Sequence, residues 1–203
     1  GKQYYVDQFI DCLILFWQNG GSVVLFSEGE PLTFQTNLFL EKIRFANNTR
    51  TELRVGGSHE GKKELKADIS GKLEEAGYFN KSNVELNKYQ RAPLGHNLEI
   101  IYEGETISFA PNDKSIYSPF IPFMKDSENG ISALFYPGDR DSSNPTGDII
   151  IDCGYTKLFD KMTEKGTIRY IQNIACWTAQ CESKRIKGIE PKDFRPKAVI
   201  FNL

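Results

Sequence analysis

Histidine and cysteine are too sparse in this chain to build the common metal or disulfide sites. The 203 residues include two histidines, His59 and His96, and four cysteines. No two cysteines form a CxxC pair, and neither histidine has the spacing to a cysteine that zinc ligands show. We therefore expect reduced thiols, as in a cytoplasmic protein, with no metal site and no cofactor.

Long hydrophobic runs and an excess of one charge are also missing. The most apolar stretch, Phe9–Trp17, contains Asp11 and falls short of the roughly 20 residues that a membrane span needs. Lysine and arginine number 25, aspartate and glutamate 27, and the formal net charge is −2. This balance predicts neither nucleic-acid nor membrane binding. The length suits one sizeable domain over residues 1–203.

The N-terminal pattern predicts a helix that leads into a buried strand. Apolar residues recur at helical spacing across Gln3–Gln18, and Asn19-Gly20-Gly21 ends the pattern with a glycine able to take positive φ. The strand Ser22–Ser27 contains the continuous apolar run VVLF, which is typical of a strand covered on both faces of a parallel sheet. The acidic loop Glu28-Gly29-Glu30-Pro31 follows, and the next helix is expected at Leu32–Lys42.

The rest of the chain predicts more strands, a hairpin and two helices. Asn129-Gly130 lies between Pro119–Lys125 and Ile131–Tyr136, which is a strong hairpin signal. The other predicted elements are strands at Glu52–Gly57, Glu105–Ala110, Asp148–Cys153 and Lys197–Leu203, a short helix at Gly71–Ala76, and a helix at Thr167–Cys181 with Thr167 as its N-cap. Together they favour an α/β fold of three layers, flavodoxin-like, with a mostly parallel sheet, helices on both faces and an inserted β-hairpin.

A helix that feeds a parallel strand is normally preceded by another strand, and here none precedes Gln3. Either another part of the chain completes the sheet, or the chain is a piece of a larger protein. The apolar segment Lys197–Leu203 could fill this position or begin a following domain. We favour sheet completion, because the segment is apolar on both faces.

Several segments together resemble the class I glutamine amidotransferase-like superfamily, and in particular its inactive or uncharacterised eukaryotic-type members. These segments are the helix ending in NGG with its strand and acidic loop, Gly95-His96 followed by Tyr102-Glu103-Gly104, and GDIIIDCGYTKLF at 147–159 followed by a helix like RYIQNIACW. The resemblance covers most of Tyr4–Cys181 and implies the fold more than an activity. Some proteins of this type are fused to von Willebrand A domains, which often begin with a strand like Lys197–Leu203.

The departures from that family concern its catalytic residues. Active members place a nucleophilic cysteine in a Gly-rich turn after a strand, and a His-x-Glu late in the chain. The matching turn near Val55–Ser58 contains Gly57-Ser58, and no histidine follows His96. The resemblance therefore implies a protein without the glutaminase triad.

Candidate site residues lie at the predicted strand ends. Ligands in open α/β sheets bind at the carboxyl ends of strands, which singles out Glu28 and Glu30, with Thr156 after the later strand. Ser58 and His59 lie in a second Gly-rich loop, where Lys62 and Lys63 could help to bind an anion. Each residue also has a plain structural interpretation, for example Glu30 at the N-terminus of the next helix.

The sequence is compatible with three functions. The first is a non-catalytic interaction or ligand-sensing module within a larger cytosolic protein, with a protein partner or the rest of the chain as its target. The second is a cysteine-dependent hydrolase that uses Cys153 with His59 or Glu28. The third is a structural subunit whose sheet a partner chain completes.

Overall fold

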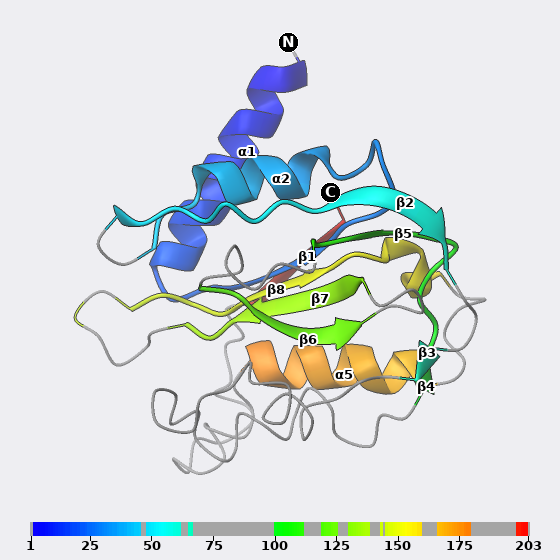
Figure 1. The fold of residues 1–203 in the computed structure, drawn as a ribbon. Helices are drawn as coiled ribbons and strands as arrows, with labels where there is room; N and C mark the ends of the chain where they lie inside the picture. Colours follow the sequence, from blue (N-terminus) through cyan, green and yellow to red (C-terminus); the bar gives the residue numbers. More distant parts are fainter. Residues whose placement is uncertain are drawn as a thin grey trace, which may run out of the picture.

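The computed structural model describes residues 2–45, 48–61, 65–66, 100–111, 119–125, 130–138, 143, 145–159, 166–179 and 198–202. The helix predicted at Gly71–Ala76 lies outside the described residues, as do Lys62, Lys63 and His96. The described part of the chain is a mixed α/β structure built on one main sheet (Figure 1). No helix in that part is long and apolar enough to cross a membrane.

The main sheet has five strands in the order β6-β7-β8-β1-β9. Their bounds are β1 Ser22–Phe26, β6 Ile121–Lys125, β7 Ile131–Tyr136, β8 Ile149–Asp152 and β9 Ala198–Asn202. β1 pairs in parallel with both β8 and β9, whereas β6 with β7 and β7 with β8 are antiparallel pairs. The predicted hairpin is confirmed as β6 and β7.

The expectation of a mostly parallel sheet is wrong, because the hairpin forms one side of the main sheet and makes it mixed. Each apolar run indicates a buried strand, but the direction of its neighbour depends on residues far away in the chain. The last strand, β9, lies beside β1, with pairs from Ser22 and Ala198 to Phe26 and Asn202.

Helix α1 (Lys2–Gln18) ends at the predicted glycines. Gly20 has a φ of 82°, its N–H donates to the carbonyl of Trp17, and the N–H of Gly21 donates to the carbonyl of Phe16. This is the Schellman arrangement, in which a residue of positive φ satisfies the last carbonyls of a helix. The Trp17 indole then donates to the carbonyl of Gly147, which joins the helix end to the segment before β8.

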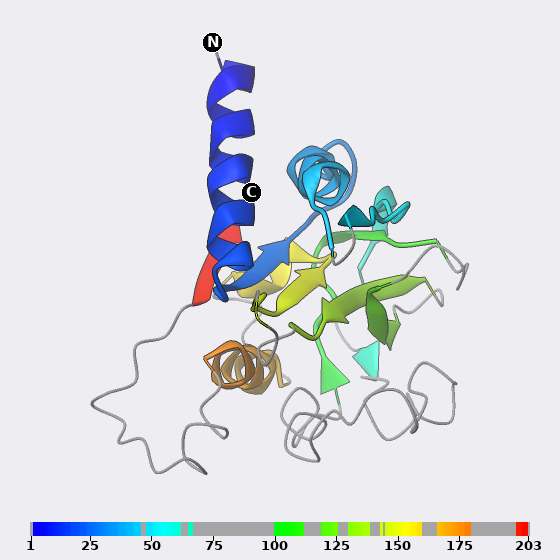
Figure 2. The same ribbon diagram turned by 90° about the vertical axis from the view of Figure 1, so that its left-hand side faces the viewer.

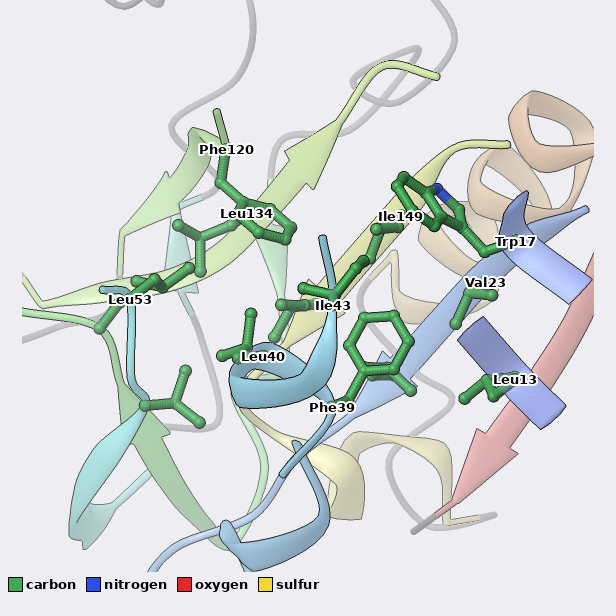
Figure 3. Packing of buried hydrophobic residues seen from close by; sticks show 14 of the residues in the cluster. Leu13, Trp17, Val23, Phe39, Leu40, Ile43, Leu53, Phe120, Leu134 and Ile149 are labelled. Atoms are coloured by element: carbon green, nitrogen blue, oxygen red, sulfur yellow. The ribbon is translucent and has the colours of Figure 1, made fainter. Parts of the chain in front are cut away.

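Helices cover both faces of the main sheet (Figure 1). α1 and α2 (Phe34–Lys42) lie on one face, and α5 (Thr167–Thr178) lies on the other. Val23 and Leu25 of β1 belong to the core under α1 and α2, whereas Val24 and Phe26 belong to the core over α5. Figure 3 shows the first of these cores, where Trp17, Phe39 and Leu40 pack toward the strands.

Two details of the predicted helices are wrong. Gly166 caps α5 with a φ of 91°, and Thr167 is the first helical residue, whose hydroxyl accepts a hydrogen bond from the N–H of Tyr102. On α5, Ile168 is exposed, whereas Tyr170 and Trp177 are buried. α2 begins at Phe34, two residues later than predicted.

Two small antiparallel sheets flank the main one: β2 (Gly56–Glu60) with β5 (Thr106–Phe109), and β3 (Leu65–Lys66) with β4 (Ile100–Ile101). The strand predicted at Glu52–Gly57 therefore begins later, and the supposed loop around Ser58 and His59 is the strand itself. β5 confirms the strand expected at Glu105–Ala110, and a bridge from Ala110 to Ile131 places its end beside β7.

Candidate functional site

The carboxyl ends of β1 and β8 lie next to each other, because the two strands are parallel neighbours. Their hydrogen bonds continue past the strand ends: the N–H of Ser27 donates to the carbonyl of Asp152, and the N–H of Tyr155 donates to the carbonyl of Ser27. The loop Glu28–Pro31 and the 3₁₀ helix η3 (Tyr155–Leu158) therefore leave the sheet side by side. This is the edge at which the sequence predicts a site.

Glu28 links three separate segments at this edge. Its Oε1 accepts hydrogen bonds from the N–H of Gly29 at 3.0 Å and from the hydroxyl of Thr106 at 2.7 Å. Its Oε2 accepts one from the N–H of Thr156 at 3.0 Å. The side chain is buried, so Glu28 joins the end of β1 to the start of β5 and to η3.

Gly29 and Glu30 join the same loop to β2. A Cβ on Gly29 would collide with the Ser58 hydroxyl and come within 3.4 Å of Thr106, so a larger residue would force Ser58 to move. Glu30 is exposed, and its Oε1 accepts a hydrogen bond from the N–H of Gly57 at 3.0 Å. Glu30 was expected to place its charge at the N-terminus of α2. Its carboxylate instead contacts β2.

A second buried polar group lies directly beneath the edge. The Lys157 ammonium donates to both carboxylate oxygens of Asp152, at 2.7 and 2.8 Å, and the Tyr170 hydroxyl donates to Oδ2 at 2.6 Å. The N–H of Gly154 adds a fourth hydrogen bond to Asp152. Burial raises the pKa of Tyr170 well above its ordinary value, and the Asp152 charge raises it further.

This group ties β8, η3 and α5 together, and all three of its side chains are fully or almost fully buried. The Lys157 ammonium forms an ion pair with Asp152. Asp152 and Tyr170 were not singled out from the sequence. The signal that could have pointed to them is a carboxylate at the end of an apolar run with a lysine five residues later.

The structure gathers four of the predicted ligand residues at the carboxyl edge. Glu28, Glu30, Ser58 and Thr156 all lie around the loop at the carboxyl edge. His59 lies on β2, half-buried, with its ring centroid 5.6 Å from that of Phe109.

Cys153 is fully buried in the core beneath α1 and α2. Its backbone carbonyl accepts a hydrogen bond from Ser108, and its N–H donates to Ser132. A thiol in such surroundings has no path to a substrate, and burial in apolar surroundings also disfavours the reactive thiolate.

Chemically, the arrangement consists of carboxylates held by internal donors. Among the described residues, no three His, Cys, Asp or Glu side chains are grouped so that they could hold a metal ion. Comparisons with protein-family models, with curated proteins and with solved structures find no match.

Proposed function

We propose that this chain is a non-catalytic α/β module that acts by binding, as part of a larger cytosolic protein. The proposal is based on the hydrogen bonds of Glu28. Its two carboxylate oxygens accept three hydrogen bonds from donors within the chain. A general acid or base must reach the proton of a substrate. Glu28 instead holds β1, β5 and η3 together.

The cysteine hydrolase is the weaker alternative. It requires the Cys153 sulfur to meet both a base and a substrate carbon. The complete burial of Cys153 argues against this role, and the ring of His59 packs against Phe109.

The resemblance to inactive members of the amidotransferase-like superfamily fits the same proposal. In that interpretation the parallel strands β8, β1 and β9 are the remainder of a flavodoxin-like core, and the hairpin β6-β7 is an addition at one side. The sequence has no histidine after His96, which is expected of a protein without the glutaminase triad.

The binding surface that we propose is the carboxyl edge itself. Three exposed apolar side chains belong to the segments that leave β1 and β8 there: Leu32 is 56% exposed, Phe34 47% and Phe159 40%. Glu30 is exposed in the same loop. Large exposed apolar side chains rimmed by polar groups are typical of protein-binding surfaces. A protein partner is therefore favoured over a small molecule.

Affinity capture from a cell extract, with identification of the retained proteins, tests this surface. We compare the wild-type chain with a Leu32→Lys, Phe34→Lys double variant, and use Leu15→Lys, which changes an exposed leucine of α1, as the matched control. The proposal predicts a partner that the wild type and the control retain and the double variant loses. The partner is then purified and its binding to each chain titrated. Equal binding by all three chains would remove the carboxyl edge as the binding surface.

A further inference from the structure

Asp152 and Tyr170 surround the Lys157 ammonium with the groups that proteins use to bind an amine. The two carboxylate oxygens of Asp152 accept hydrogen bonds from the ammonium at 2.7 and 2.8 Å. The same nitrogen lies 5.4 Å from the centroid of the Tyr170 ring, within the range of a cation–π contact. All three side chains are buried. A negative charge, two acceptors and an aromatic face are therefore directed at one ammonium group.

The carboxylate of Asp152 is held in place by donors other than the lysine. The N–H of Gly154 donates to Oδ1 at 2.9 Å, and the Tyr170 hydroxyl donates to Oδ2 at 2.6 Å. Asp152 ends β8, which pairs with β1 on one side and with β7 on the other. Tyr170 lies on α5, and Figure 2 shows this helix on the face of the sheet opposite α1 and α2. The groups that receive the ammonium therefore belong to the core of the fold.

The ammonium itself comes from a different kind of segment. Lys157 belongs to η3, a 3₁₀ helix of four residues at the carboxyl edge, where ligands of open α/β sheets bind. The N–H groups of Tyr155 and Thr156 attach η3 to the Ser27 carbonyl and to Glu28. The residues of η3 other than Lys157 are half-buried. We expect η3 to open more readily than the strands, because short segments at the surface have low local stability.

Stability alone does not account for a lysine at this position. The cost of removing two charges from water is often as large as the attraction between them, and apolar side chains of similar volume are often as stable. Here the cation is carried by a short segment, and its carboxylate and aromatic ring are held by the sheet and a helix. This is the arrangement of a ligand and its site.

We propose that Asp152 and Tyr170 form a binding site for a primary ammonium group, that Lys157 fills this site from within the chain, and that η3 is the strap that carries Lys157 into it. When η3 leaves the edge, the alkylammonium group of another molecule can replace that of Lys157. The ligand is a primary amine, because a quaternary ammonium has no N–H to donate to the two carboxylate oxygens. The proposal does not rest on the protein-binding surface at Leu32 and Phe34.

Chemical rescue of a Lys157→Ala variant at pH 7 tests the site. The variant lacks the part of the side chain that n-propylammonium can supply. Its melting temperature should rise by about 3–5 °C for each tenfold increase in n-propylammonium concentration above the dissociation constant. n-Propanol, which has the same length but no charge, and tetramethylammonium, which has no N–H, should have no effect. The double variant Lys157→Ala, Asp152→Asn is the matched control and should not respond to n-propylammonium.

Amide hydrogen exchange in the wild-type chain tests the strap and requires no variant to fold. The amides compared are those of Thr156, which donates to Glu28, and of Val24 in β1, which has a strand on each side. Thr156 should exchange faster than Val24. At ten times its dissociation constant, n-propylammonium should speed the exchange of Thr156 by about tenfold and leave Val24 unchanged, because it captures the chain with η3 released. The methylamide of acetyl-lysine, used in place of n-propylammonium, shows whether the site also takes a lysine side chain.

Either experiment can overturn the proposal. The site is refuted by a folded Lys157→Ala variant that n-propylammonium does not stabilise, or by an equal response of the double variant. The strap is refuted if Thr156 exchanges as slowly as Val24, or if n-propylammonium leaves its rate unchanged. If the variants do not fold, the exchange measurement decides. The Leu32→Lys, Phe34→Lys comparison tests the carboxyl-edge surface separately, so either proposal can fail alone.

Discussion

The ammonium of Lys157 lies 2.7 and 2.8 Å from the two carboxylate oxygens of Asp152, and both side chains are buried beneath the carboxyl edge of the sheet. Lys157 belongs to η3, the segment that follows β8. Its ion pair with Asp152 therefore holds η3 against the end of β8. The same segment places the N–H of Thr156 on Glu28. Both buried carboxylates, Glu28 and Asp152, therefore accept hydrogen bonds from the same short segment, η3.

Removing the cation should be costly, because Asp152 would keep a buried charge without its counter-charge. We expect Lys157→Met to lower the free energy of unfolding by about 3–5 kcal/mol, measured by chemical denaturation. The double variant Lys157→Met, Asp152→Asn removes both charges and should recover part of the loss. A single variant as stable as the wild type would show that Asp152 does not need the lysine.

Tyr170 should make the protein sensitive to alkaline pH. Because burial and the Asp152 charge raise the pKa of Tyr170 in the folded state, the folded protein keeps this proton while the unfolded chain loses it near pH 10. The stability that this provides is complete below about pH 10 and falls as the pH rises further. Tyr170→Phe should lower stability at neutral pH by about 1–3 kcal/mol, because it removes a hydrogen bond to a charged acceptor.

Denaturation curves at a series of pH values separate this effect from others. The stability difference between wild type and Tyr170→Phe should shrink above about pH 10. The pKa of Lys42 is also raised, by its hydrogen bonds to Asp7 and Asp11, but this contribution is common to both chains and cancels. If the stability difference between wild type and Tyr170→Phe stays constant above pH 10, Tyr170 is not the source of the alkaline sensitivity.

Glu28→Gln tests the carboxylate that joins β1, β5 and η3. One oxygen becomes an amide nitrogen, which cannot accept a hydrogen bond. The N–H of either Gly29 or Thr156 therefore loses its acceptor. We expect a loss of about 1–3 kcal/mol in the free energy of unfolding. The matched control is Glu30→Gln, in the same loop but exposed, which should change stability by no more than about 0.5 kcal/mol. Equal effects from both substitutions would argue against the special role of Glu28.

The thiols should differ sharply in reactivity. Cys12 and Cys176 are exposed and Cys153 is fully buried. Under native conditions a maleimide should therefore label Cys12 and Cys176 quickly and Cys153 only after unfolding, as peptide mass spectrometry would report. Rapid native labelling of Cys153 would mean that the core opens there.

Local sequence patterns predicted most of the individual elements. The helical spacing of α1, the glycines that end it, the apolar runs of β1 and β8 and the Asn-Gly hairpin each depend on residues close together in the chain. The mixed sheet could not be predicted in this way, because strand direction is decided by pairing between distant segments. β2 was misplaced for the same reason: its sequence, GGSHE, has little strand character, and its partner β5 begins at Thr106.

Parts of the candidate site lie together at one edge of the sheet, but their hydrogen bonds could not be predicted from the sequence. Parallel strands predict that Glu28 and Thr156 meet at one edge, and they do. The pattern of residues could not show that both oxygens of Glu28 are occupied by donors 1, 78 and 128 residues away in the chain. Nor could it show that Lys157 is buried, since lysine is rarely buried unless paired.

We propose that the groups at the carboxyl edge hold the fold together and perform no hydrolysis. The most direct measurement is the rate at which the purified chain hydrolyses glutamine and an activated ester, compared with the Cys153→Ala variant. Both chains should show the same rate as the buffer blank. Turnover by the wild type that Cys153→Ala abolishes, with the variant still folded, would show that the chain is a hydrolase.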